Sequence, residues 1–232
     1  MQKTPNKALI IGAIIAIVAI ALVSVAPVAY KAYMTPGVKT NGIATENAKK
    51  ASTDINGQWH VIKAVPGNPT SVGYTFHEIL PGERRETSGS TKNVEGTINV
   101  QNTKLTGANI SVDMTAITTD REKRDINVRS KLLHTDKFPT ATFTLADGAN
   151  VDLAELPDNA TTGRVSVPGI LTIHGVAKPA TADMEILRTG DQIVAAATIP
   201  INRLDYGVET PEFVAAKIDT EGEINIRLAL EK

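Results

Sequence analysis

The hydrophobic pattern begins with an uninterrupted apolar run near the N-terminus. From Ala8 to Ala29 the chain has 22 residues without a charge, dominated by Ala, Ile, Leu and Val. As a helix they would extend about 33 Å, enough to cross a hydrocarbon core of about 30 Å. Lys3 and Lys7 precede the run, which favours a cytoplasmic N-terminus and an extracytoplasmic C-terminal part. We therefore predict that residues 1–30 form a single, retained transmembrane anchor in the cell membrane.

A cleaved signal peptide is the alternative interpretation of the same run. The apolar part of a signal peptide is usually about 7–15 residues long and ends at a small-x-small site. Ser24-Val25-Ala26 fits such a site, but Pro27 would follow the cut and hinder it. Both interpretations export the C-terminal part of the chain.

Residues 31–54 show no hydrophobic period. Pro36-Gly37 and Asn41-Gly42 are turn-forming pairs within a polar stretch. We predict a flexible linker over this range, followed by one folded domain at residues 55–232.

From Gly57 onward, short segments alternate between apolar and polar residues. In one of them Ile110, Val112 and Met114 would face one side of a strand, and the polar residues between them the other. This period of two indicates a sheet with one dry and one wet face. Similar segments recur at 59–62, 71–76, 94–100, 142–145, 165–167, 171–173 and 224–228. Many short strands in succession favour a mainly antiparallel sandwich or barrel.

One stretch, residues 119–133, breaks this alternation and has helical character. Thr119 or Asp120 could cap its N-terminus, and Ile126, Arg129 and Leu133 would share one face. We predict a single short helix that closes one end of the β domain.

The amino-acid composition excludes several classes of function. The chain has 232 residues, a formal net charge of −1, no cysteine and 4% aromatic residues. No basic patch indicates nucleic-acid binding, and thiol catalysis, disulfides and thiolate metal sites are excluded. The four histidines lack metal-ligand spacing, and no catalytic motif or carboxylate pair is present. We expect no catalytic residue, no metal site, no required cofactor and no enzymatic activity.

Three later segments have specific residue sequences that the apolar–polar alternation of a strand does not require. They are Lys137-Phe138-Pro139-Thr140-Ala141-Thr142-Phe143, Gly169-Ile170-Leu171-Thr172-Ile173-His174-Gly175-Val176-Ala177-Lys178-Pro179 and Arg203-Leu204-Asp205-Tyr206-Gly207-Val208. In this order, and with the predicted helix ahead of them, they resemble the YceI-like family over about residues 57–232. The resemblance implies a bacterial, exported, lipocalin-like antiparallel barrel of about eight strands. It also implies an apolar tunnel for a long isoprenoid lipid, such as a polyprenyl phosphate or a quinone.

The large apolar residues on the inward faces would line such a tunnel, or else form an ordinary core. An eight-stranded barrel is wide enough for either arrangement. A phosphate or quinone head would need a donor at the tunnel mouth, for which Arg129 is the candidate, unless Arg129 only pairs with Asp125 at i,i+4. The predicted lining consists of Tyr74, Phe76, Ile98, Val100, Ile110, Val112, Met114, Phe138, Phe143, Leu145, Leu171 and Ile173.

Two hypotheses about function follow. The first is a membrane-tethered extracytoplasmic protein that binds or carries an isoprenoid lipid, held by its polyprenyl or quinone tail. The second is an accessory or structural subunit of a membrane complex, such as a respiratory complex, with the anchor and the barrel surface as contacts. Gly12, Ala13 and Ala16 would permit close helix packing in that case. The sequence leaves the identity of the ligand open.

Overall fold

The computed structural model describes residues 7–33, 36–80, 83–210 and 217–232, which belong to two compact units. The first contains helix α1 (Lys7–Tyr33), and the second begins at Pro36 and ends at Lys232.

Helix α1 coincides with the apolar run at the N-terminus. The side chains of Ile15, Ile17 and Ile20 are each more than half exposed. Among the described residues, no helix combines the length and the hydropathy that a membrane span requires. The helix is therefore confirmed, whereas its role as a membrane anchor stays a prediction.

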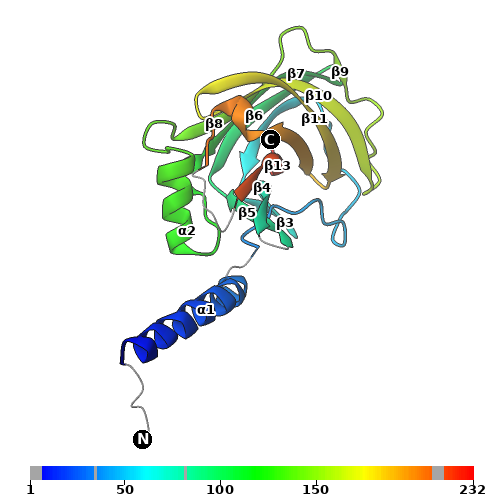
Figure 1. Cartoon of the computed structure of the whole chain (residues 1–232). Helices are drawn as coiled ribbons and strands as arrows, with labels where there is room; N and C mark the ends of the chain where they lie inside the picture. The colour runs from blue at the N-terminus through cyan, green and yellow to red at the C-terminus, as the bar shows by residue number, and fades with distance from the viewer. Residues whose placement is uncertain (1–6, 34–35, 81–82, 211–216) are drawn as a thin grey trace, which may run out of the picture. The chain divides into compact units, whose positions relative to one another are not determined.

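The second unit is built around a closed antiparallel barrel (Figure 1). Eight strands follow one another in the order β1-β6-β7-β8-β10-β11-β12-β13, and β13 pairs with β1 to complete the ring. A barrel is thus confirmed over a sandwich. The strands are β1 (Gly57–Ile62), β2 (Ala64–Val65), β3 (Asn68–Pro69), β4 (Ser71–Leu80), β5 (Glu83–Thr91), β6 (Val94–Gln101), β7 (Lys104–Asp113), β8 (Thr140–Leu145), β9 (Val151–Asp152), β10 (Thr162–Ile173), β11 (Val176–Thr189), β12 (Gln192–Asn202) and β13 (Lys217–Glu231).

Strand β13 closes the ring because it is long enough to serve two neighbours on the same edge. Leu230 and Glu231 near its end pair with Val61 and His60 of β1. Its earlier part, residues 217–227, pairs with β4 instead. Strands β4 and β5 therefore form a hairpin that extends the sheet beside the ring.

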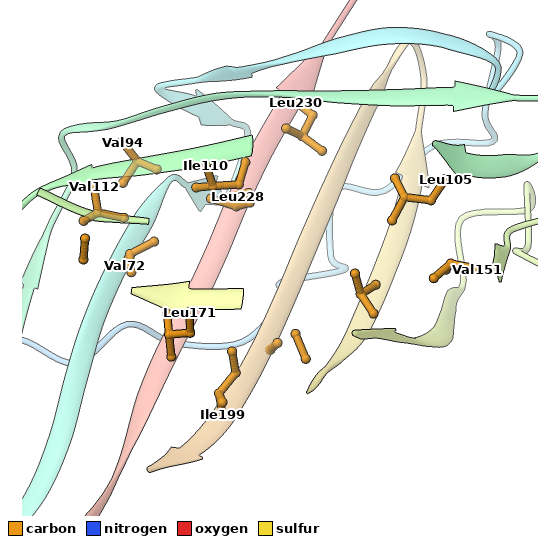
Figure 2. Close-up of a cluster of buried hydrophobic side chains, with 14 of the residues drawn as sticks. Val72, Val94, Leu105, Ile110, Val112, Val151, Leu171, Ile199, Leu228 and Leu230 are labelled. Atoms are coloured by element: carbon orange, nitrogen blue, oxygen red, sulfur yellow. The ribbon is translucent and has the colours of Figure 1, made fainter. Parts of the chain in front are cut away.

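Side chains in the barrel wall alternate as the sequence predicts. Ile110 and Val112 of β7 are buried, and so is Leu171 of β10. Figure 2 shows these side chains around a shared interior, together with Val72 of β4 and Leu228 of β13. Burying one such side chain contributes about 1.5–3 kcal/mol, so the inner face is a main source of stability.

The alternation does not predict strands β5, β11 and β12. In β12 all residues from Ile193 to Ala197 are buried, which removes the period of two. Both faces of β12 are covered, because Val194 belongs to a second apolar cluster with Val65 and Ala229, against which Ile43 packs. The predicted segments 165–167 and 171–173 are parts of one strand, β10.

Residues 36–54, which we call the strap, lie against the barrel. The amide of Val38 donates to the carbonyl oxygen of Ser88 at 3.3 Å, and Arg227 Nη1 donates to the carbonyl oxygen of Gly42 at 3.0 Å. The amide of Lys49 donates to Thr189 Oγ1 at 2.9 Å. The compact unit thus begins at Pro36, within the range predicted to be a linker. Polar and backbone contacts of this kind leave no hydrophobic period in the sequence.

The helix predicted at residues 119–133 consists of α2 (Glu122–Asn127) and a π-helical turn, η2 (Val128–Leu132). Its N-cap is Arg121 with no side-chain cap bond, so capping by Thr119 or Asp120 was a wrong prediction. The predicted apolar face was also wrong, because Ile126 is 51% exposed and Val128 is buried. Two short 3-10 turns, η1 (Met114–Ala116) and η3 (Arg203–Tyr206), complete the unit.

Asp125 connects α2 to the segment that precedes it. Its Oδ1 accepts hydrogen bonds from the amide and the hydroxyl of Thr119, both at 2.6 Å, and its Oδ2 accepts one from Thr118 at 2.7 Å. Burial alone would raise the pKa of this carboxyl. The hydrogen bonds from both threonines and the charge of Arg129 outweigh burial and hold the pKa below its ordinary value.

We expect Asp125→Asn to lower the free energy of unfolding by about 1–3 kcal/mol at neutral pH. A carboxyl with a lowered pKa in the folded state stabilises above its unfolded pKa of about 4 and loses that contribution in acid. The loss relative to wild type should therefore shrink as the pH falls below about 4. Urea denaturation at neutral and acid pH measures it, with the exposed Asp136→Asn as control. An equal loss at both pH values would contradict the role of the charge.

Candidate functional site

The barrel encloses an apolar cavity of about 180 Å³. All eight strands of the ring and strand β4 contribute side chains to its wall. The surface open to the cavity consists almost entirely of carbon atoms. The interior is therefore suited to a hydrocarbon chain and offers no polar partner for a head group.

Ten of the twelve predicted lining residues border this cavity, and Phe138 and Leu145 do not. Leu145 packs against the core, and the ring of Phe138 lies 4.4 Å from the imidazole of His174, centroid to centroid. Inward alternation identified the others, because one face of each strand points to the interior. Contact of these residues with a ligand stays a prediction.

Several residues at one end of the cavity were not among the predicted lining residues. Trp59 is in a segment predicted as a strand, so its inward position could have been read from the alternation. Ile55, Leu153 and Leu156 come from loops, which carry no period. They line the cavity only because the chain folds back across the barrel end.

Arg203 is the one charged residue among the described residues that line the cavity. Its side chain is buried and donates to three carbonyl oxygens: Val208 at 2.7 Å, Asp219 at 3.1 Å and Ile218 at 3.3 Å. Burial lowers the pKa of this guanidinium, while the charges of Asp219 and Glu209 oppose the shift. Arg203 thus holds the η3 turn to the start of β13.

Tyr74 borders the cavity with its ring 6.1 Å from that of Phe76, centroid to centroid. Burial raises the pKa of its phenol above the usual range; the charge of Arg124 opposes this rise and that of Asp125 adds to it. The phenol therefore stays neutral at physiological pH. Arg124 and Asp125 belong to α2, and Glu78 of β4 also raises the pKa of Tyr74, so the phenol lies within reach of charges from both elements.

The three motif segments of the sequence meet where the turn between β10 and β11 lies against η3. Phe138 packs on His174, and the Nδ1–H of His174 donates to the carbonyl oxygen of Tyr206 at 3.2 Å. Gly175 has a φ of +74°, and a Cβ there would lie 2.6 Å from the Phe138 ring, so no larger residue fits. The cluster joins the turn between β10 and β11 to η3. It accounts for His174 as a structural residue.

Arg129 does not line the cavity. Its Nη1 donates to the carbonyl oxygen of Ile117 at 3.1 Å, and its charge lowers the pKa of Asp125. It is part of an outer surface pocket with His134 and Lys137. Its proposed contact with a head group stays a prediction. Within the described part of the chain, no three His, Asp or Glu side chains are grouped to hold a metal ion.

Fold and site together define a class: small closed β-barrels with an apolar interior cavity. The domain model for the YceI-like domain matches residues 65–230. The chain therefore belongs to the YceI-like family.

Curated relatives named Protein YceI match a shorter part of the chain. The Escherichia coli protein is 30% identical over 110 residues, covering 44% of this chain and 50% of the relative. The Salmonella arizonae protein is 28% identical over 106 residues, with the same coverage. The chain thus spans about half the length of the curated relatives it matches.

Two solved structures share the fold. BcnA from Burkholderia cenocepacia has a TM-score of 0.55 at 19% identity, covering 69% of this chain and 94% of BcnA. A domain from Saccharophagus degradans described as polyisoprenoid-binding has a TM-score of 0.54 at 17% identity, covering 74% of this chain and 97% of that domain. Identities this low show a common fold and no more.

Proposed function

We propose that this protein binds an isoprenoid lipid by its hydrocarbon tail inside the barrel. The observation that carries the proposal is the apolar cavity, whose accessible surface is almost entirely carbon. The Saccharophagus degradans domain of the same fold, described as polyisoprenoid-binding, supports this ligand class. The binding requires no catalytic step and no cofactor.

We further propose that the protein acts from a membrane, with the barrel on the extracytoplasmic side. The support is the charge-free run from Ala8 to Ala29 with Lys3 and Lys7 ahead of it. A tethered barrel would exchange lipid with the bilayer to which it is attached. Fractionation of cells that express the full chain, with carbonate extraction of membranes, tests this placement.

The size of the cavity limits how much of a ligand it can hold. At about 180 Å³ it is smaller than the roughly 300–1,000 Å³ of typical ligand pockets. A long tail would therefore displace side chains or leave part of its length outside. Mass spectrometry of organic extracts from natively purified protein should detect a stoichiometric prenyl lipid. Its absence after purification in mild detergent would contradict the proposal.

Phe143→Ala tests the cavity wall directly. The Phe143 ring borders the cavity and packs over Gly169, where an added Cβ would meet it at 2.3 Å. We expect the variant to retain its circular dichroism spectrum and to lose about tenfold or more in affinity for a prenyl alcohol, because an aromatic contact is removed. Unfolding with unchanged affinity in the folded fraction would instead make Phe143 a plain core residue.

An accessory subunit of a membrane complex is the second candidate. Gly12, Ala16 and Ala19 recur at helical spacing in α1 and would give a narrow face for another helix. Native gels of solubilised membranes should then show the full chain migrating with a larger complex, and deletion of residues 1–30 should release it.

A further inference from the structure

The two ends of the cavity differ in how they are closed. At one end, which we call the floor, the lining comes from Ile55, Trp59, Leu105, Leu153 and Leu156, all of which are buried. The strand register places them together, because Leu105 opposite Val151 lies where β7 meets β9. Figure 2 shows Leu105 and Val151 on one side of the interior, away from Val112 and Leu171.

Hydrogen bonds fix the floor in place. The amide of Thr103 donates to Asn56 Oδ1 at 2.8 Å, and the carbonyl oxygen of Thr103 accepts from the amide of Leu153 at 2.8 Å. The amide of Leu156 donates to the carbonyl oxygen of Leu153 at 3.1 Å. The segment before β1, the β6–β7 turn and the loop after β9 are therefore joined across this end.

At the opposite end two polar residues border the cavity, although almost no polar surface is open to its interior. Arg203 and Tyr206 line it from η3, which follows β12, and Leu133 lines it from the end of η2. Leu133 and Met114 are only half-buried there, unlike the residues of the floor. In Figure 1, α2 and β9 lie on opposite sides of the barrel. A ligand with a polar head and an apolar tail would lie with its head toward α2 and η3.

Trp59 is the rigid centre of the floor. It is 1% exposed and is the largest of the fully buried side chains that the structure describes. Its indole N–H donates to the carbonyl oxygen of Ile55 at 2.8 Å, and Lys232 Nζ lies 5.1 Å from its ring centroid. β1 pairs with both β6 and β13: Trp59 lies opposite Ile98 of β6, and its neighbour His60 pairs with Glu231 of β13.

We propose that the isoprenoid chain enters tail-first from the end bordered by Leu133 and η3, and that Trp59 is the stop that sets how many isoprene units fit. This inference rests on the proposed lipid binding and adds an orientation and a length limit to it. The small cavity volume agrees with it, since a chain that reaches the floor has no further space to extend.

Fluorescence of the wild-type protein tests the orientation. Trp59 is the single tryptophan of the chain, so its emission reports on the floor alone. Two geranylgeraniol probes are compared, one brominated at the far end of the tail and one next to the hydroxyl. We expect the tail-brominated probe to quench Trp59 and the head-brominated probe to bind without quenching. Equal quenching, or quenching only by the head-brominated probe, overturns the orientation.

Binding of each brominated probe is measured separately by its displacement of tritiated geranylgeraniol from the protein. If tritiated geranylgeraniol does not bind and neither probe binds, the proposed lipid binding fails, and the inference fails with it. If both bind but the quenching pattern is wrong, lipid binding stands and only the inference falls.

The length limit is tested with Trp59→Leu and a series of farnesol, geranylgeraniol and solanesol. We expect the variant to shift its preference toward longer chains by about tenfold relative to wild type, because the vacated space admits more apolar surface. Phe76→Leu is the matched control, since it widens the wall from β4 without opening the floor. An unchanged preference in folded Trp59→Leu overturns the stop. Should that variant fail to fold, Trp59→Phe is used, with a smaller shift in the same direction.

Discussion

Replacing Arg203 with leucine should lower the free energy of unfolding by about 4 kcal/mol, since three carbonyl oxygens, buried or partly buried, lose their donor. The guanidinium donates to the carbonyls of Val208, Ile218 and Asp219, which belong to two different segments. No neutral side chain of similar length can replace three diverging N–H groups. The variant should therefore release the η3 turn from β13.

Arg203→Lys should lose nearly as much, because a single ammonium cannot match the planar fork of arginine. Arg164→Leu is the control, since Arg164 is an exposed arginine on β10. Its effect should stay within about 0.5 kcal/mol. Urea denaturation followed by circular dichroism measures all three variants. A loss below about 1 kcal/mol in Arg203→Leu would mean that water replaces the guanidinium, and that this end of the barrel is open.

The inward face of the barrel could be predicted because burial on one side imposes a period of two. Ile110 and Val112 follow that rule. β12 does not, because the second apolar cluster covers its outer face and leaves no polar positions between Ile193 and Ala197. Alternation therefore detects a wall with one wet face, and fails where a second layer lies on the wall.

The floor of the cavity could not be predicted for a different reason. Leu153 and Leu156 are in a loop, and their place depends on hydrogen bonds to a turn some fifty residues earlier. No local pattern encodes such contacts. The end of the cavity near η3 could be predicted only in part. The motif segments singled out Phe138, His174 and Tyr206, but nothing in the sequence indicated that these residues contact one another. Arg203 is the first residue of one of these segments, but the donor predicted from the sequence was Arg129.

Deleting the strap together with α1 should destabilise the barrel more than deleting residues 1–35 alone. A chain without residues 1–35 keeps the whole compact unit and should retain the stability of the barrel. A chain without residues 1–54 loses Ile43, which packs on Val65, Val194 and Ala229, and the donor–acceptor pair between Arg227 and Gly42. From the exposed apolar area and the lost hydrogen bonds we expect a loss on the order of 5 kcal/mol.

The comparison distinguishes a strap from a linker, because a linker can be removed without cost to the domain it precedes. Urea midpoints of the two truncated chains measure the difference, and binding of a hydrophobic dye reports exposure of Val194 and Ala229. A point variant, Ile43→Ser, should move the midpoint in the same direction, whereas Ile79→Ser, at a side chain that is 47% exposed, should leave it nearly unchanged. Equal midpoints for the two truncations would show that the barrel stabilises itself and that residues 36–54 merely rest on it. A large difference would mean that residues 36–54 act as part of the outer wall of the barrel, to which Gly42 is joined through Arg227 of β13.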